Sequence, residues 1–159
     1  MLTVCLLLAL CNIHGLESKS IDIFLAFPQA DLDVDIWMEL PTGIVISGKD
    51  NKSRAYVLKL KESIYGLKQA SLNWFEKLKQ GLMDRSFTSS EIDPCLYLKE
   101  NMVLLTYVDD CIIISPSHES IDRLISSMQS GPENFRLTDE GGVNKFLGVE
   151  ITRLDDNSF

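Results

Sequence analysis

Two adjacent carboxylates interrupt an apolar run near the middle of the chain and restrict how that run can fold. The run reads TYVDDCIII over residues 106–114, and its charged pair is Asp109 and Asp110. Ionised groups are costly to bury unless something neutralises them. The pair therefore lies at an exposed turn, holds a metal ion, or is a defect in folding. The run by itself does not decide among these three interpretations.

Length and composition predict a single domain over residues 1–159. A chain of 159 residues that is 45% hydrophobic and 24% charged can bury a substantial core. Its net charge of -8 argues against a simple basic nucleic-acid-binding module. The cysteines show no CxxC spacing, so neither a zinc site nor a disulfide framework is indicated. We expect small buried side chains in a reducing compartment for Cys5, Cys11, Cys95 and Cys111.

The charge is distributed unevenly along the chain. Residues 49–85 hold nine basic and four acidic side chains, a net charge of +5. The remainder holds six basic and nineteen acidic side chains, a net charge of -13. A basic stretch of this kind could follow the phosphate backbone of a template. A solvated helix and hairpin face explains the same composition equally well.

The first residues, MLTVCLLLALCNIHG, resemble the apolar part of a signal peptide but lack its flanking features. No positive charge precedes the apolar run, and no small-residue cleavage site follows it. The run is also too short to span a bilayer. We expect a helix over residues 3–14 that is buried nearly all round. Secretion and a membrane partner are not expected.

The spacing of apolar residues predicts alternating strands and helices along the rest of the chain. Short strands are expected in SIDIFLAF, DIWMELP and AYVLKLK, and a strand or hairpin in NKFLGVEITRL. Hairpin turns are expected at Glu100-Asn101 and at Val108-Asp109-Asp110. This order predicts an α+β fold in which helices pack on one face of a mainly antiparallel sheet.

Two further helices are expected to pack against this sheet. The first covers residues 70–85 and turns Lys77 and Lys79 toward solvent. Its expected inward positions are Leu72, Phe75, Leu78 and Leu82. The second opens at Pro116 and Ser117. Its expected inward positions are Ile121, Leu124, Ile125 and Met128.

A third acidic residue, Asp22, is the lone charge of another apolar strand. If its strand neighbours the strands around Asp109 and Asp110, three carboxylates converge at one edge of the sheet. Such a group is stable only with cations between its members, and Mg²⁺ is the hard ion that carboxylates and phosphate oxygens bind. Two such ions are the arrangement used for in-line phosphoryl displacement. Spacing alone does not identify a polymerase.

Several motifs resemble the polymerase domain of copia-type LTR retrotransposons. YVDD between apolar strands resembles the catalytic hairpin of reverse transcriptases. LKLKESIYGLKQASLNWF resembles the block written S-L-Y-G-L-K-Q-A in that family. LLLALCNIHGLESKSIDIFLAF, DLDVDIWMELPTGI and VNKFLGVEI resemble other family segments, in the family's order, over residues 6–153. The combination of YGLKQA with YVDD is more specific than either motif alone.

This resemblance implies an RNA-directed DNA polymerase that adds deoxynucleotides to a primer 3′-OH. It implies that Asp22 and Asp109 bridge two Mg²⁺ ions, for which Mn²⁺ can substitute. It implies a more peripheral role for Asp110 and a coordinating backbone carbonyl at Ile23. Phe27 would be the steric gate against a ribose 2′-OH. The implied nucleotide-binding residues are Tyr65, Gly66, Lys68 and Gln69, and the implied primer-contacting residues are Tyr107, Phe146, Leu147 and Gly148.

The resemblance also sets expectations about domain content and partners. It implies a reverse-transcriptase palm with part of the fingers, truncated at both ends and without thumb, RNase H or integrase segments. The implied partners are an RNA or DNA template with its primer, deoxynucleoside triphosphates and the rest of a retrotransposon polyprotein. The implied location is cytoplasmic, in a virus-like particle, or nuclear. Pro28, Ala30 and Leu72 depart from the family pattern.

Truncation predicts little polymerase activity for this chain alone. The alternative to an enzyme is a degenerate or co-opted module that keeps the palm fold for non-enzymatic interactions.

Overall fold

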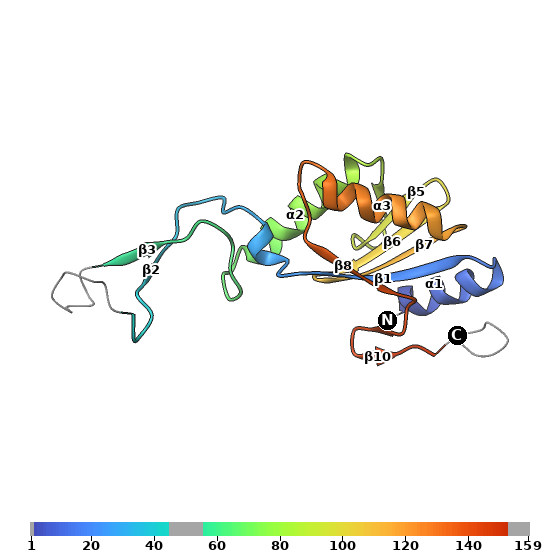
Figure 1. Ribbon diagram of the computed structural model, residues 1–159, viewed down its shortest axis with the longest axis horizontal. Helices are drawn as coiled ribbons and strands as arrows, with labels where there is room; N and C mark the ends of the chain where they lie inside the picture. The colour runs from blue at the N-terminus through green and yellow to red at the C-terminus, as the bar shows by residue number, and fades with distance from the viewer. Residues whose placement is uncertain (1, 45–55, 153–159) are drawn as a thin grey trace.

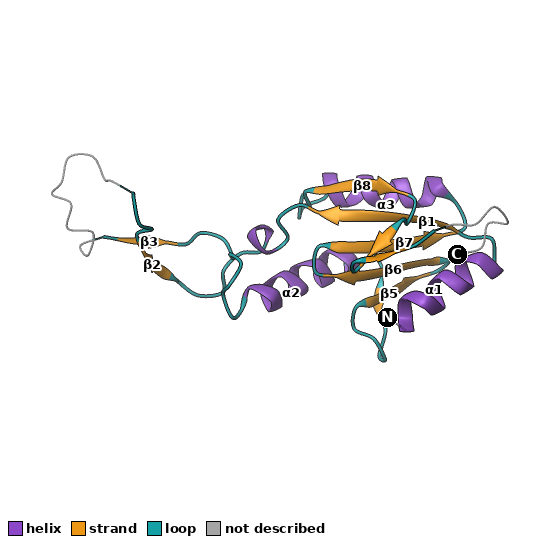
Figure 2. Ribbon diagram, turned by 90° about the horizontal axis from the view of Figure 1, so that it is seen from below, coloured by secondary structure: helices purple, strands orange, loops and turns teal. Residues whose placement is uncertain are grey.

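The computed structural model describes residues 2–44 and 56–152, which form a layered core and an arm that projects from one end of it (Figure 1). A six-stranded sheet forms the middle layer, with the strand order β4-β5-β6-β7-β1-β8 and antiparallel pairing throughout. Figure 2 shows these strands side by side. The six strands are β1 (Glu17–Ile23), β4 (Thr88–Ser89), β5 (Leu96–Lys99), β6 (Met102–Tyr107), β7 (Asp110–Ser115) and β8 (Leu137–Gly141).

The expected α+β class, the antiparallel sheet and both hairpin turns are confirmed. Strands β5 and β6 are joined through Glu100 and Asn101, as predicted. Strands β6 and β7 are joined through Val108 and Asp109, and Asp110 already belongs to β7, where it pairs with Tyr107. The turn beside the paired carboxylates is therefore a two-residue connection.

One face of the sheet carries helices α2 (Ala70–Met83) and α3 (His118–Ser130). The α3 helix begins as predicted, because the Ser117 hydroxyl accepts a hydrogen bond from the Ser120 backbone N–H at 3.3 Å and so caps a free donor. The inward positions predicted for this helix are confirmed: Ile121, Leu124, Ile125 and Met128 are all buried.

The opposite face carries α1 (Leu2–Ile13) and a small hairpin of β9 (Lys145–Phe146) and β10 (Val149–Glu150). The prediction that helices pack on one face only is therefore wrong. Strand β7 shows why, because Cys111 and Ile113 belong to the α2–α3 core whereas Ile112 and Ile114 belong to the α1 core. A strand that is apolar on both faces needs a cover on both.

Helix α1 is buried along one face only, so the expectation of a helix buried nearly all round is also wrong. Val4, Leu7, Leu8 and Cys11 face the sheet, but Leu2 is 85% and Ile13 is 73% exposed. Uniform hydrophobicity did not indicate which side of the helix would meet the sheet. Within the described residues, every helix falls short of the length and apolar character needed to cross a bilayer. The four cysteines form no disulfide among the described residues. Cys11 and Cys111 are buried as expected, but Cys5 is exposed and Cys95 is half-buried, so the expectation of burial is wrong for these two.

The inward positions predicted for helix α2 are confirmed at Leu78 and Leu82 and are wrong at Leu72, while Trp74 takes an inward position that was not predicted. Trp74 is 2% exposed and lies with Leu78 and Leu82 against the sheet, whereas Leu72 is 59% exposed. Phe75 is only half-buried. Lys77, expected in solvent, is half-buried as well and donates a hydrogen bond to a backbone carbonyl of the core. The buried residues Trp74, Leu78 and Leu82 thus recur every four positions along α2.

Gly81 lies on the buried face of α2, and its replacement by alanine is expected to destabilise the protein. Alanine normally improves a helix interior by about 1 kcal/mol over glycine. Here, however, the added Cβ would lie 2.7 and 2.8 Å from two ring carbons of Phe135. We therefore expect Gly81→Ala to lower the free energy of unfolding in urea by about 1–3 kcal/mol. Gly142→Ala is the control, because its Cβ meets nothing within 4 Å, and a more stable Gly81→Ala protein would contradict this packing.

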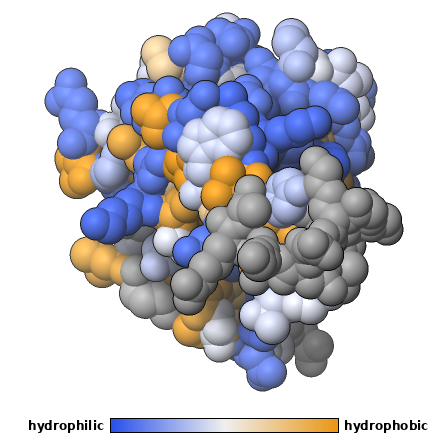
Figure 3. Space-filling model, turned by 90° about the vertical axis from the view of Figure 1, so that its left-hand side faces the viewer, coloured by the Kyte–Doolittle hydropathy of each residue, from blue (hydrophilic) through white to orange (hydrophobic). Residues whose placement is uncertain are grey.

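The arm consists of β2 (Trp37–Glu39) and β3 (Val57–Lys59), which pair with each other and make no further strand pairing within the described residues. Both strands were predicted, although β3 is shorter than the predicted strand and exposed at every position. Lys59 forms an ion pair with Asp35 at 2.7 Å and lies 5.6 Å above the Trp37 ring. Seen from the arm, this end of the molecule is largely hydrophilic with apolar patches between (Figure 3).

Candidate active site

Strand register brings the three acidic residues together at one end of the sheet. Asp22 near the end of β1 lies directly opposite Asp110 at the start of β7. The backbone N–H of Ile23 donates to the backbone carbonyl of Asp109 at 2.8 Å. Because β1 and β7 are both inner strands of the sheet, flanked by β8 and β6, the group lies at the ends of inner strands rather than along an outer strand.

The turn that carries Asp109 has an unusual backbone. Val108 has a φ of +57°, a conformation that is costly for a β-branched residue. Its carbonyl accepts a hydrogen bond from the buried Trp74 indole Nε1–H at 2.9 Å. A hydrogen bond from helix α2 therefore holds the turn that carries Asp109.

Electrostatic repulsion acts within this group of acids. Burial raises the pKa of Asp22, and the nearby Glu140 and Asp109 carboxylates raise it further. The pKa of Asp110 is raised by burial first and then by Asp22, Glu140 and Asp109, while Lys145 lowers it. In the metal-free protein, the ionised forms of Asp22 and Asp110 are therefore less stable in the folded state than in water.

Glu140 is a fourth carboxylate at this site that sequence reasoning missed. It lies on β8, which pairs with β1, and accepts a hydrogen bond from the Ser20 hydroxyl at 2.8 Å. Nothing in the local sequence LTDEGG marks this position, because its proximity to Asp22 depends on the pairing of strands far apart in the chain.

The Asp109 carboxylate has one satisfied and one unsatisfied oxygen. Its Oδ2 accepts a hydrogen bond from the Tyr65 hydroxyl at 3.0 Å. Its Oδ1 is buried and has no hydrogen-bond partner among the described residues. Over residues 2–44 and 56–152, no group of three or more His, Cys, Asp or Glu side chains is already arranged around one metal position. A buried carboxylate oxygen without a donor, beside Asp22 and Asp110, nevertheless fits a hard cation that takes one or two carboxylates.

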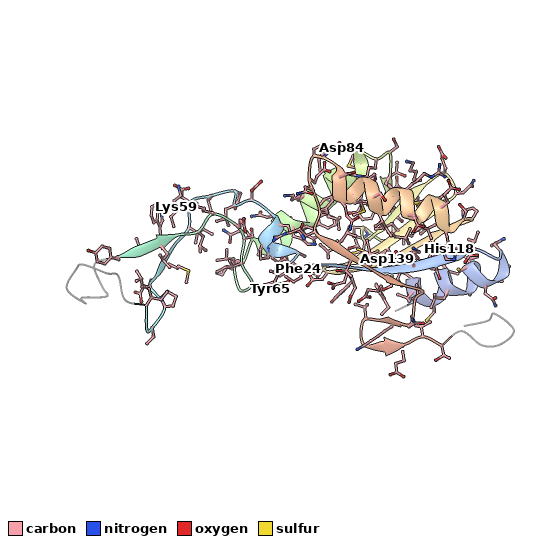
Figure 4. The ribbon with its side chains drawn as sticks, viewed as in Figure 1. Phe24, Lys59, Tyr65, Asp84, His118 and Asp139 are labelled. Carbon is pink, nitrogen blue, oxygen red and sulfur yellow. The ribbon has the colours of Figure 1, made fainter. Side chains whose placement is uncertain are left out.

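Aromatic side chains form a wall beside Asp109. Phe27 opens a short 3-10 helix just after β1, and its ring centroid lies 4.6 Å from that of Tyr65. Figure 4 shows Tyr65 where the arm meets the core. Because Tyr65 also bonds to Asp109, the structure brings the predicted gate residue and the predicted nucleotide-binding tyrosine to the acidic group.

The segment of Phe27 is fixed by Gln29, a residue that sequence reasoning missed. Gln29 is 9% exposed. Its Nε2 donates to the carbonyls of Phe24 and Arg136 at 2.8 and 3.0 Å, and its Oε1 accepts from the Arg136 N–H at 2.8 Å. One buried amide thus ties the segment of Phe27 to Arg136, the residue just before the strand that carries Glu140. A lone glutamine after a proline gives no such signal in the sequence.

Comparison with known proteins identifies the family. The model of a family described as reverse transcriptase (RNA-dependent DNA polymerase) matches residues 1–157. The chain belongs to the reverse transcriptase family.

The curated relatives are polyproteins of transposons. A retrovirus-related Pol polyprotein from transposon TNT 1-94 of Nicotiana tabacum is 34% identical over 92% of this chain and 11% of the relative. That from transposon RE1 of Arabidopsis thaliana is 31% identical over 86% of the chain and 9% of the relative. A putative transposon Ty5-1 protein of Saccharomyces cerevisiae is 31% identical over 82% of the chain and 41% of the relative.

These relatives confirm the expected copia-type origin. The chain spans only about a tenth of the first two relatives. No solved structure is significantly similar to it.

In this reverse transcriptase chain, the remaining predicted nucleotide-binding residues lie in the segment just before α2. Gly66 has a φ of +96°, which favours glycine. Lys68 is exposed. Gln69 is the residue just before α2, and its side chain makes no capping hydrogen bond in the described part of the chain. Their contacts with a nucleotide stay predictions.

The β9–β10 hairpin presents less of its predicted primer-contacting surface than expected. Phe146 is 3% exposed and packs in the α1 core. Leu147 and Gly148 form the turn, with φ values of +50° and +78° that suit a two-residue hairpin connection. Tyr107 is 57% exposed beside Asp110. The Phe146 ring is therefore not at the surface, and primer contacts by Leu147, Gly148 and Tyr107 stay predictions.

The basic stretch is less free to bind phosphates than its composition indicates. The Arg85 side chain is 12% exposed and forms an ion pair with Glu133 at 3.0 Å. Lys59 pairs with Asp35, and Lys77 is engaged with the core. Three of the nine basic residues lie outside the described residues: Lys49, Lys52 and Arg54. Arg85 is therefore not available to a phosphate backbone, whereas a role of the other basic residues of 49–85 along a template stays a prediction.

Proposed function

We propose that this chain supplies the palm core of the RNA-directed DNA polymerase of a copia-type retrotransposon, with the arm as part of the fingers. The reaction is the addition of a deoxynucleotide to a primer 3′-OH with release of pyrophosphate. The observation that carries the proposal is the register that places Asp22 opposite Asp110, with Asp109 in the adjoining turn. In a member of the reverse transcriptase family, that is where metal-binding carboxylates are expected.

The residues at this site have the chemistry needed to hold Mg²⁺, with Mn²⁺ as a substitute. The unsatisfied Oδ1 of Asp109 and the carboxylate of Asp22 would be ligands, Asp110 would lie at the periphery, and the Ile23 carbonyl would complete the set. The chemistry that bound Mg²⁺ supplies is a lower pKa for the primer 3′-OH and neutralisation of charge on the phosphates. The cost of repulsion among these acids falls when a cation binds, which supports the assignment.

Phe27 would select deoxynucleotides in this proposal. Its ring packs on Tyr65, whose hydroxyl bonds to Asp109, so the aromatic wall lies beside the acidic group. A ring at this place would clash with a ribose 2′-OH and leave room for a deoxyribose. Gln69 and Lys68 would contact the incoming nucleotide and its template partner.

The test is primer extension with poly(rA)/oligo(dT), Mg²⁺ and dTTP. The chain is assayed alone and also in place of the matching segment of the tobacco TNT 1-94 polyprotein's polymerase region. We expect extension by the chimera and little by the chain alone, whose net charge of -8 weakens its affinity for nucleic acid. Asp109→Asn is the matched control and is expected to abolish extension. A chimera that folds but extends no primer, or one that keeps its activity with Asp109→Asn, would contradict the proposed function.

A further inference from the structure

The buried Trp74 makes a contact that the proposed chemistry does not use. Its indole lies on the α2 face of the sheet, packed edge-on against Phe135 with ring centroids 5.9 Å apart. Asp22 and Asp110 lie on the opposite face, because their neighbours Ile23 and Cys111 belong to the α2–α3 core and side chains alternate along a strand. Trp74 can therefore reach the acidic group only through the backbone.

The acceptor of the indole N–H is the carbonyl of Val108 in the turn. The carbonyl of the next residue, Asp109, accepts from the backbone N–H of Ile23 on β1. A peptide unit is planar, so fixing a carbonyl fixes the orientation of the whole unit. The peptide planes on both sides of the Asp109 Cα are thus anchored, one by Trp74 and the other by β1. The direction of the Asp109 Cα–Cβ bond follows from these two anchors.

The turn needs an external anchor because its own conformation is unfavourable. Val108 has a φ of +57° and a β-branched side chain, a combination that persists only where surrounding contacts enforce it. Packing alone would explain the burial of Trp74 but not why its N–H is directed at this carbonyl. Phenylalanine would keep much of the packing and lose the donor, which makes the two roles separable.

We propose that Trp74 is a positioning residue that sets the orientation of Asp109 for divalent-metal binding through its hydrogen bond to the Val108 carbonyl. This inference rests on the proposed function, since it assigns the metal role to Asp109. It adds a residue that touches neither metal nor substrate.

The experiment measures the turn and the metal site separately on the whole chain. Amide and indole N–H signals are recorded by NMR for the wild type and for Trp74→Phe, and Mn²⁺ affinity is measured by calorimetry. Trp74→Phe is expected to shift the amide signals of Val108 and Asp109 and to weaken Mn²⁺ binding about 10–100-fold, as loss of an orienting partner does at metal sites. In the wild type, the Trp74 indole N–H should exchange with solvent more slowly than that of Trp37, which is 57% exposed.

Two controls separate positioning from general loosening of the core. Trp37→Phe removes the other indole and should leave Mn²⁺ affinity unchanged. Ile121→Val weakens the same core without touching the indole bond, and should also leave the affinity unchanged. If Trp74→Phe does not fold, 3-benzothienylalanine at position 74 retains the ring shape without the N–H and is tested in its place.

The outcomes distinguish this inference from the proposed function. Wild-type Mn²⁺ affinity in the Trp74 variant, or an equal loss of affinity in Ile121→Val, would overturn the positioning role and leave the proposed function standing. Absence of Mn²⁺ binding in the wild type would contradict the proposed function. In that case only the NMR spectra test the hydrogen bond from Trp74 to the turn. Unshifted amide signals of Val108 and Asp109 in Trp74→Phe would then overturn its positioning role.

Discussion

Asp22→Asn is expected to make the metal-free protein more stable than the wild type at pH 7. The pKa of Asp22 is raised by burial and by the carboxylates of Glu140 and Asp109, so its charged form is disfavoured in the folded state. Asparagine keeps the shape and removes the charge. A gain of about 1 kcal/mol, the order of one like-charge contact fully screened by water, would raise the thermal midpoint by about 2–4 °C for a chain of this size.

The same substitution should change how stability depends on pH. A carboxyl group whose pKa is raised on folding binds more protons in the folded than in the unfolded state. Its contribution to stability is therefore lost as pH rises above its ordinary value of 3.8. The stability gained by Asp22→Asn should accordingly be small at pH 4 and grow toward pH 7.

The difference between variant and wild type is the quantity to measure, because other groups contribute in the opposite direction. Burial raises the pKa of Asp139, but the hydrogen bond from Lys19 and other contacts more than offset this and lower the pKa overall. That contribution is present in both proteins and cancels. Calorimetric scans in EDTA from pH 4 to pH 7 provide the measurement. A variant that is no more stable than the wild type at pH 7 would show that the acids do not repel one another.

Phe135→Ala is expected to cost about 3–5 kcal/mol of the free energy of unfolding. Phe135 is 1% exposed, meets the Trp74 ring edge-on and would lie against any Cβ added at Gly81. Truncation leaves a cavity between α2 and the segment after α3. Because domains are stable by only about 5–15 kcal/mol, such a loss can consume most of the total.

Urea unfolding measures this loss, and Phe135→Leu is the matched control. Leucine retains most of the apolar volume and should cost less than about 1.5 kcal/mol if the neighbours repack. Equal costs for the two variants would show that the site does not depend on ring volume. A cost below about 1 kcal/mol for Phe135→Ala would contradict its central place in the core.

Local patterns predicted those parts of the fold that depend on neighbouring residues. The hairpin at Val108-Asp109 follows from two apolar strands separated by charge, and the start of α3 follows from the capping side chain of Ser117. The phase of α2 could not be obtained in this way. Leu72 and Trp74 are both large and apolar, and the surface that α2 meets decides which of them is buried.

The candidate site shows the same limit. Asp22, Asp109 and Asp110 could be singled out because each carboxylate interrupts an apolar run. Glu140 and Gln29 could not, because each acquires its role through strands or loops distant in sequence. The hydrogen bond between Tyr65 and Asp109 likewise links residues 44 positions apart. Such contacts are consequences of the assembled fold rather than of any local pattern.

The most direct test of the account is the response of the thermal midpoint to Mg²⁺ in the wild type and in Asp109→Asn. A ligand that binds only the folded state stabilises it by about 2.7 kcal/mol at a hundredfold excess over Kd. We predict a midpoint that rises with Mg²⁺ concentration in the wild type and does not rise in Asp109→Asn. A wild-type midpoint that is indifferent to Mg²⁺, or an equal rise in both proteins, would contradict the assignment of Asp22, Asp109 and Asp110 as a metal site.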